Sequence, residues 1–224
     1  MKNLVFDTSS VITLVTNNLL DLLMPLKSKF KGDFFIPKSV EYELVDKPLQ
    51  GKMFKLEALI VRNVIKNNLL KTYSDNIDVD SLLNQINSMF IMNDRPIILV
   101  SKAEVEALAL AINLQSSAYV VDERTMRLLI EDPIKLKKLQ ERKLHNKIRI
   151  NKDVLNEFSK YVKNVKVIRS TELMLIAYEF GLMDKYLVSN TTNEDLLDAL
   201  LWGLKLRGCA ISQEEVDSFI ELEK

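Results

Sequence analysis

The segment Leu4-Val5-Phe6-Asp7-Thr8-Ser9-Ser10 constrains the fold more than any other part of the chain. A short apolar run ends in a carboxylate, and three small hydroxyl residues follow it. This pattern predicts a buried strand over residues 3–6 that carries Asp7 to the carboxyl edge of a sheet. Open α/β sheets build their binding sites at that edge, so Asp7 is expected at a functional position.

Strand-like and helix-like segments alternate along the first 130 residues. The apolar spacing predicts the following elements in order: helix 9–27 with a break at Asn17-Asn18, strand 34–36, a short helix around Val40, helices 51–72 and 78–91, and an extended run 97–100. Ser101 and Glu104 then form a capping box that opens a helix, which is apolar on all sides over 107–112 and is expected to be buried. Strand 118–121 and helix 123–130 follow. Such alternation is typical of a three-layer α/β/α fold with a mainly parallel central sheet.

A segment rich in lysine and asparagine, residues 131–165, interrupts this alternation and is interpreted as a helical or hairpin insertion. One more strand near 165–168 and helices over 171–180, 193–207 and from Ser212 onward are expected. Without a flexible linker or an internal repeat, residues 1–224 are predicted to form a single domain with this insertion.

Composition restricts the chemistry. Lys plus Arg and Asp plus Glu both number 31, so any basic surface has to be a local patch. Cys209 and His145 are the single residues of their types, which excludes cysteine-based zinc sites and multi-histidine centres. Any metal would therefore be a hard cation held by oxygen atoms. The first residues lack the apolar core of a signal peptide, and no 18-residue apolar window exists, so a cytoplasmic protein without a membrane span is expected.

Four carboxylates occupy equivalent places, each at a junction between a strand and a helix: Asp7, Glu43, Glu104 and Asp122. A parallel sheet would gather them at one edge. Two carboxylates about 5 Å apart repel by about 3 kcal/mol at an effective dielectric constant of 20. Mg²⁺ or Mn²⁺ between them would relieve that repulsion. Each residue alone also has a simpler explanation as a helix cap, a turn residue or a solvated charge.

Four motifs occur in an order that resembles the PIN-domain ribonucleases, in particular their VapC-like archaeal and bacterial branch. They are Asp7-Thr8-Ser9-Ser10, Pro37-x-x-Val40-x-x-Glu43-Leu44, Ser101-x-x-Glu104-x-x-Ala107-Leu108 and Val120-Val121-Asp122-Glu123-x-x-x-Arg127. The tail from Arg169-Ser170-Thr171-Glu172 to Ser212 is similar to the closing part of that branch. The resemblance implies a PIN-like fold and an Mg²⁺- or Mn²⁺-dependent endoribonuclease, with Asp7, Glu43, Glu104 and Asp122 as metal ligands.

Further residues near these motifs are candidates for supporting roles. The resemblance implies that Thr8 or Ser9 hydrogen-bonds the site. Glu106 and Glu123 each lie close enough in sequence to compete with a neighbouring acid. Residues two apart on a helix point about 200° away from each other, so Glu104 and Glu106 cannot both face one metal. Three basic residues flank the motifs and are candidates for holding RNA phosphates: Lys102, Arg124 and Arg127.

Three functions remain open at this stage. The first is a metal-dependent ribonuclease that hydrolyses RNA phosphodiester bonds. The second is the toxin of a toxin–antitoxin pair, which shares that chemistry and adds an antitoxin-like protein partner. The third is a non-catalytic PIN-like scaffold in RNA processing. RNA and a second copy of the chain are the other expected partners.

Overall fold

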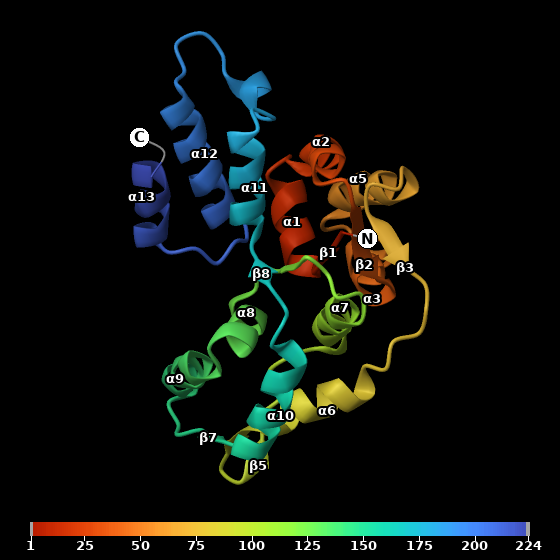
Figure 1. Cartoon of the computed structure of the whole chain (residues 1–224), viewed down its shortest axis with the longest axis vertical. Helices are drawn as coiled ribbons and strands as arrows, with labels where there is room; N and C mark the ends of the chain where they lie inside the picture. The colour runs from red at the N-terminus through yellow and green to blue at the C-terminus, as the bar shows by residue number, and fades with distance from the viewer. Residues whose placement is uncertain (1, 223–224) are drawn as a thin grey trace.

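A computed structural model of the chain describes residues 2–222 (Figure 1). Its centre is a five-stranded sheet in the order β3-β2-β1-β6-β8, in which every neighbouring pair is parallel. The strands are β1 (Asn3–Phe6), β2 (Asp33–Pro37), β3 (Lys71–Tyr73), β6 (Ala118–Val120) and β8 (Val167–Ile168). Helices flank this sheet, which confirms the predicted three-layer α/β/α fold.

The strand order reverses beside β1. The chain moves from β1 outward through β2 to β3 and then returns to the other side of β1 to form β6 and β8. Val5 pairs with Tyr119 and Phe6 with Val120, so β1 and β6 end at the same level. A reversal of this kind is the topological switch point at which open α/β sheets bind ligands.

The helices before this switch point are α1 (Thr8–Thr16), α2 (Leu23–Phe30), α3 (Lys38–Glu41), α4 (Lys47–Gln50), α5 (Lys55–Lys66), α6 (Asp80–Met89) and α7 (Lys102–Asn113). The later ones are α8 (Arg124–Glu131), α9 (Pro133–Leu144), α10 (Lys152–Val162), α11 (Ser170–Glu179), α12 (Asn193–Leu206) and α13 (Gln213–Leu222). Helix α7 packs against β1, β2 and β6 and is buried from Ala107 to Ala111. This burial confirms the prediction drawn from its apolar residues on all sides.

A second, antiparallel sheet lies at the lower end of Figure 1 in the order β5-β4-β7. It joins β4 (Phe90–Met92) and β5 (Arg95–Pro96) to the distant β7 (Arg149–Ile150). Helix α10 packs against α6. Residues 131–165 therefore contain two helices and a strand, and they pair with residues 80–96 instead of folding alone.

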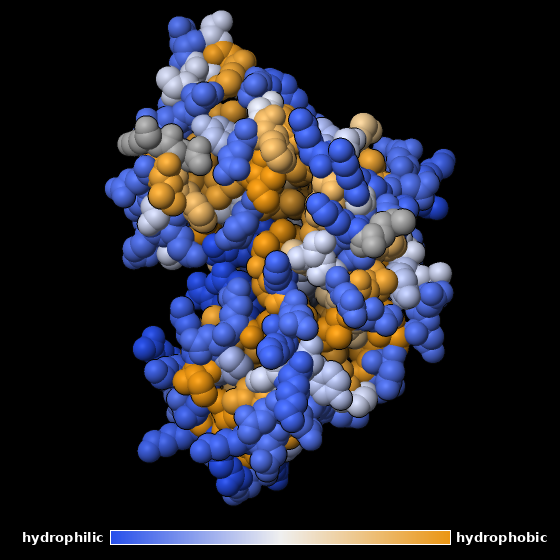
Figure 2. Space-filling view, viewed as in Figure 1, coloured by the Kyte–Doolittle hydropathy of each residue, from blue (hydrophilic) through white to orange (hydrophobic). Residues whose placement is uncertain are grey.

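Helices α11, α12 and α13 form the upper end of the molecule (Figure 1). They share a small apolar cluster made of Leu175, Leu197, Leu201, Ile211 and Val216. Helix α11 also packs against α1, which joins this end to the main sheet. Figure 2 shows polar side chains over most of this face, with apolar side chains gathered in its upper half around α11.

The predicted break at Asn17-Asn18 is confirmed, because α1 ends at Thr16 and α2 begins at Leu23. One local expectation was wrong. The helix predicted over 51–72 ends at Lys66, and Lys71–Tyr73 is the edge strand β3, because pairing with β2 overrides a weak local helical pattern. The extended run predicted over 97–100 directly follows the hairpin of β4 with Arg95–Pro96 and joins no strand. Within residues 2–222, no single helix is long and apolar enough to cross a membrane; only Thr8–Thr16 taken together with Leu20–Phe30, bent by 112°, meets the length and composition required.

Candidate functional site at the carboxyl edge of the sheet

Asp7 directly follows β1 and lies at the switch point. Its backbone N–H donates to the carbonyl of Val120 on β6, with an N···O distance of 3.0 Å. The side chain is 1% exposed. Its Oδ2 accepts hydrogen bonds from the Ser9 N–H (3.2 Å) and the Ser9 hydroxyl (2.8 Å), which also makes Asp7 the N-cap of α1. Its Oδ1 is buried and has no hydrogen-bond partner.

This environment disfavours the charged form of Asp7. Burial raises the pKa of Asp7 from 3.8 to about 7, and the negative charge of Glu104 adds to the rise, while the hydrogen bonds from Ser9 oppose it. None of the groups that set this pKa is a cation. Burial is therefore the main cause of the raised pKa of Asp7, and repulsion from Glu104 is a smaller one.

Ser9 ties the two sides of the switch point together. While its hydroxyl donates to Asp7, its oxygen accepts the backbone N–H groups of Asp122 (3.0 Å) and Glu123 (3.2 Å). The neighbouring Ser10 hydroxyl donates to the carbonyl oxygens of Asp7 and Val120. The two serines thus hold the end of β1 against the end of β6. This bridging explains why small hydroxyl residues follow Asp7.

Glu43 is joined to the same segment through Thr8. The Thr8 hydroxyl donates to Glu43 Oε2 at 2.6 Å, and both side chains are half-buried. Glu43 lies in a π-helical turn, Tyr42–Asp46. Short π-helical turns are frequent at functional sites. The structure therefore brings Glu43 to the residue that follows Asp7.

Glu104 lies at the start of α7, where it forms the predicted capping box with Ser101. Its Oε2 accepts the Ser101 N–H at 2.6 Å, and its own N–H donates to the Ser101 hydroxyl at 3.4 Å. Its charge still acts on Asp7 and on Tyr119. Glu106 instead acts on Lys102, which is ion-paired with Asp80 at 2.9 Å.

At the end of β6, Asp122 and Glu123 face different surroundings. Asp122 is fully buried, and its two oxygens accept the Ser170 N–H (2.7 Å) and the Ser170 hydroxyl (2.6 Å) at the start of α11. Glu123 is half-buried and caps α8 by accepting the Met126 N–H at 2.8 Å, and its charge reaches Tyr119. Tyr119 is thus influenced by Asp7, Glu104 and Glu123.

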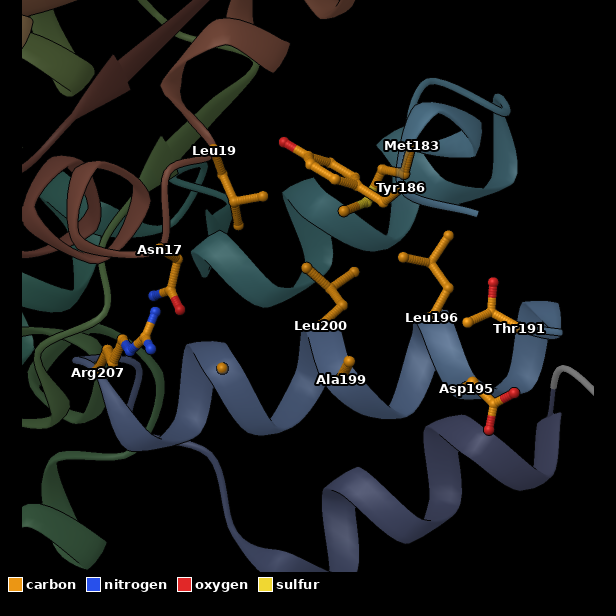
Figure 3. A pocket seen from close by; sticks show the side chains of 11 residues that line it. Asn17, Leu19, Met183, Tyr186, Thr191, Asp195, Leu196, Ala199, Leu200 and Arg207 are labelled. Carbon is orange, nitrogen blue, oxygen red and sulfur yellow. The ribbon is translucent and has the colours of Figure 1, made fainter. Parts of the chain in front are cut away.

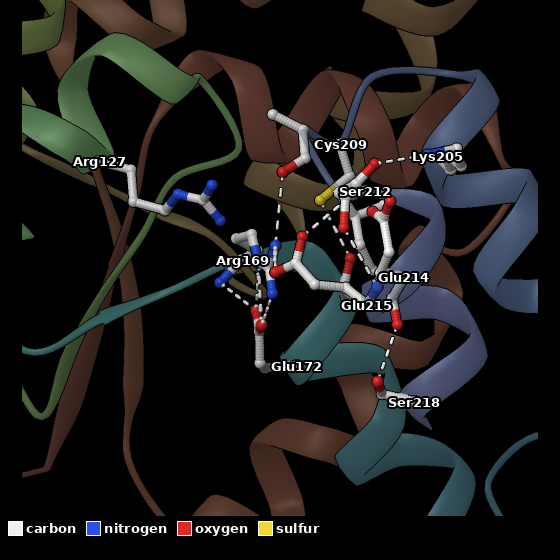
Figure 4. A network of polar contacts seen from close by, with 12 residues as sticks. Arg127, Arg169, Glu172, Lys205, Cys209, Ser212, Glu214, Glu215 and Ser218 are labelled. Atoms are coloured by element: carbon white, nitrogen blue, oxygen red, sulfur yellow. Dashed lines mark hydrogen bonds and ion pairs between the residues drawn. The ribbon is translucent and has the colours of Figure 1, made fainter. Parts of the chain in front are cut away.

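The start of α11 is fixed by a buried arginine, as Figure 4 shows. Arg169 is 6% exposed and hydrogen-bonds Glu172, with which it also forms an ion pair. It reaches Glu215 on α13 at 2.8 Å and the carbonyl of Ala210 at 3.4 Å. Burial acts to lower the pKa of Arg169, but the two carboxylates outweigh it and raise that pKa. This network places Ser170 in front of Asp122.

Among residues 2–222, the other basic candidates, Arg124 and Arg127, form no ion pair with the candidate site carboxylates. Arg124 is exposed, and Arg127 lies 3.8 Å from Glu131. Arg127 and Arg169 line a polar cavity of about 370 Å³ between α8 and the start of α11. In Figure 4, the Arg127 guanidinium points toward this network.

A larger cavity, of about 400 Å³, lies away from the carboxylate edge, between the end of α1, the turn Asp184–Tyr186 and α12 (Figure 3). Its walls are mostly apolar, with Leu19, Leu196 and Leu200 pointing inward (Figure 3). The one acid among its lining residues, Asp195, caps α12 through Thr192. This cavity therefore offers no set of oxygen ligands.

The donors at the carboxylate edge fit a hard divalent cation. Asp7 Oδ1 is a buried oxygen without a partner, and Glu104 and Glu123 bring further negative charge to the same place. Mg²⁺ is usually bound by one or two carboxylates, with water or substrate phosphate as the remaining ligands. Within residues 2–222, no three Asp, Glu, His or Cys side chains are arranged to hold one metal ion. An ion bound at this edge would take one or two carboxylates, Asp7 and Glu104, and complete its shell with water or phosphate oxygens.

Two positions with structural roles here were missed by the sequence interpretation. Ser170 was noted as part of the tail motif, but its pairing with Asp122 was not foreseen. The sequence gives no sign of a role for Tyr119, because it lies within the apolar run of β6 like any other buried strand residue. Both contacts depend on long-range packing.

A parallel sheet with helices on both faces and acids at its switch point has its candidate site where open α/β sheets bind their ligands. A family model described as a PIN domain matches residues 3–132. The chain therefore belongs to the PIN-domain family, whose members are typically nucleases and generally use divalent metals. No curated protein and no solved structure matches the chain significantly.

Proposed function

We propose that this chain is an Mg²⁺- or Mn²⁺-dependent endoribonuclease acting in the cytoplasm. The observation that carries the proposal is the buried carboxylate of Asp7, which has one unpartnered oxygen and a pKa of about 7 beside the charge of Glu104. An isolated domain gains nothing from such an arrangement, because a buried acid without a compensating partner destabilises the fold. A cation bound there would compensate it.

Asp7 and Glu104 would hold the ion. At the end of β6, Glu123 is favoured over Asp122 as the carboxylate that acts on the ion, through a bound water, since the oxygens of Asp122 are both engaged by Ser170. Asp122 would then orient the end of β6 through α11. Glu43, held by Thr8, would border the site. When bound, a divalent cation supplies Lewis-acid stabilisation of a phosphodiester and activates water.

Cleavage of single-stranded and structured RNA, measured with Mg²⁺, with Mn²⁺ and with EDTA, tests this function. Cleavage should require the metal and be lost in Asp7→Asn. The control is Asp94→Asn, which changes an exposed acid of the β4–β5 hairpin that is ion-paired with Arg149, and it should cleave normally. Metal-independent cleavage, or full activity of Asp7→Asn, would contradict the proposal.

The choice between Asp122 and Glu123 has its own test. Glu123→Gln should abolish metal-dependent cleavage while leaving the melting temperature nearly unchanged. Asp122→Asn should mainly lower the melting temperature, because it weakens the bonds to Ser170. The reverse pattern would restore Asp122 as the metal ligand.

A second candidate is the toxin of a toxin–antitoxin pair. The observation that favours it is an exposed apolar face on and beside α5, formed by Met53 (72% exposed), Phe54 (54%), Leu56 (68%) and Leu59 (51%). Lys52, Lys55 and Arg62 surround this face and are exposed. An amphipathic protein segment with acidic flanks would match it.

Expression of the chain in a host cell tests the toxin role. The wild type should arrest growth, and Asp7→Asn should not. Leu56→Glu should keep the arrest but prevent an antitoxin-like partner from relieving it. If neither RNA cleavage nor growth arrest is seen, the third function, a non-catalytic PIN scaffold, is supported instead.

A further inference from the structure

Tyr119 places a hydroxyl in the interior of the molecule. It lies in the middle of β6, paired with Val5 of β1 on one side and Val167 of β8 on the other. Its side chain is 0% exposed, and its hydroxyl is buried without a hydrogen-bond partner. Buried polar groups are nearly always paired, so an unpaired hydroxyl needs an explanation.

A matching acceptor lies at the same edge. Asp7 Oδ1 is also buried and unpartnered. Tyr119 and Asp7 lie on adjacent strands, and the Asp7 N–H bonds the carbonyl of Val120, the residue after Tyr119. The two unpartnered atoms are one hydroxyl donor and one carboxylate acceptor.

Electrostatics supports their proximity. Burial raises the pKa of Tyr119, and the negative charges of Asp7, Glu104 and Glu123 raise it further, Asp7 contributing most among the three. Tyr119 is therefore a neutral phenol at ordinary pH, able to donate its proton in a hydrogen bond.

We propose that Tyr119 is a positioning residue of this site: its hydroxyl is linked to Asp7 Oδ1 through one bridging water molecule, to which it donates a hydrogen bond, and so orients that carboxylate. The functional effect of this contact rests on the proposed function, because orienting Asp7 matters only if Asp7 holds a cation. Residues that orient metal ligands commonly change metal affinity by roughly 10–100-fold when they are mutated.

The direction in which one substitution shifts the melting temperature distinguishes this role from that of an unpaired core hydroxyl. Tyr119→Phe removes only the hydroxyl. If that group is unpaired, the substitution should raise the melting temperature, because it removes a buried hydroxyl that has no hydrogen-bond partner. If it is linked to Asp7, the substitution should lower the melting temperature by roughly 3–10 °C for a domain of this size.

The test is a double-mutant cycle in EDTA at pH 8.5. Tyr119→Phe should lower the melting temperature in the wild-type background and have no effect, or raise it, in Asp7→Ala. Asp7→Asn serves as a second background should Asp7→Ala not fold, and it should show a smaller decrease than the wild type. Tyr161→Phe, which changes a tyrosine that is 60% exposed, is the control and should change nothing. An increase in the wild type, or equal decreases in all backgrounds, would overturn the proposal.

Calorimetric titration with Mn²⁺ provides the second readout. Tyr119→Phe should weaken Mn²⁺ binding roughly 10–100-fold, and Tyr161→Phe should not. Equal Mn²⁺ affinity in Tyr119→Phe and wild type would remove the positioning role. A wild type that binds no Mn²⁺ would contradict the proposed function, whereas the melting cycle would still decide whether Tyr119 is linked to Asp7.

Discussion

Replacing Asp7 with asparagine should stabilise the metal-free protein. The folded-state pKa of Asp7 is about 7, against 3.8 for an ordinary aspartate. Each pKa unit corresponds to about 1.4 kcal/mol, so ionising this buried group above pH 7 costs about 4 kcal/mol. Asparagine avoids that cost and can still accept the two hydrogen bonds from Ser9.

The gain will be smaller than this figure. In asparagine, the amide NH₂ would replace Oδ1, which has no direct hydrogen-bond partner and which the proposed link from Tyr119 approaches with a donor, and a poorly paired buried donor costs about 1–3 kcal/mol. A net stabilisation of about 1–3 kcal/mol remains. For a chain of this size, it corresponds to a rise in melting temperature of roughly 2–10 °C.

The pH dependence identifies the cause. Because the folded-state pKa is raised, the folded protein binds more protons than the unfolded chain between pH 3.8 and about 7, and wild-type stability falls as the pH rises through that window. Asp7→Asn lacks this decrease. Its advantage over wild type should therefore be largest at pH 8 and smaller at pH 5 by roughly 2–3 kcal/mol.

Thermal melts followed by circular dichroism in EDTA at pH 5 and pH 8 measure both effects. Asp33→Asn is the control of opposite sign, since Lys71 (2.8 Å) and Lys27 (3.3 Å) lower the pKa of Asp33. It should destabilise the protein, more at neutral pH than under acid conditions. An Asp7→Asn variant that loses stability equally at both pH values would refute the reasoning and make Asp7 a simple helix cap.

Three further predictions follow from the same contacts. Glu104→Gln should remove metal-dependent RNA cleavage and Glu106→Gln should keep most of it, as measured by initial rates; the opposite result would mean that α7 presents Glu106 to the site. Arg169→Met should destabilise the protein by roughly 2–4 kcal/mol in urea unfolding at pH 7, because it leaves Glu172 and Glu215 without their cation. Since the pKa of Glu172 is lowered in the fold, this loss should shrink below pH 4.5, and a constant loss would argue against the ion pair. Ser170→Ala should cost about 1–3 kcal/mol in the same assay by removing a buried donor to Asp122, and an unchanged midpoint would show that this bond contributes nothing.

Local sequence information was sufficient for much of the fold. The run before Asp7 predicted β1, and the Ser101–Glu104 capping box predicted the start of α7. The alternation of apolar runs predicted the parallel sheet, because a strand buried on both faces and a helix with an apolar face have distinct periods. The sequence also placed Asp7, Glu104 and Asp122 at the junctions where the structure has them.

Tertiary packing decided the rest. The edge strand β3 and the second sheet depend on pairing between residues far apart, such as Phe90 with Ile150, and local patterns carry no information on such partners. The same holds for side-chain direction at the end of β6. From the sequence, Asp122 and Glu123 are equally good candidates for the fourth acid. In the structure, Arg169 fixes the start of α11, and Ser170 there hydrogen-bonds Asp122. The charge of Glu123 instead acts on Tyr119, together with the charges of Asp7 and Glu104. Adjacent residues that leave a strand point in different directions, so only the elements packed around them determine which carboxylate reaches the site.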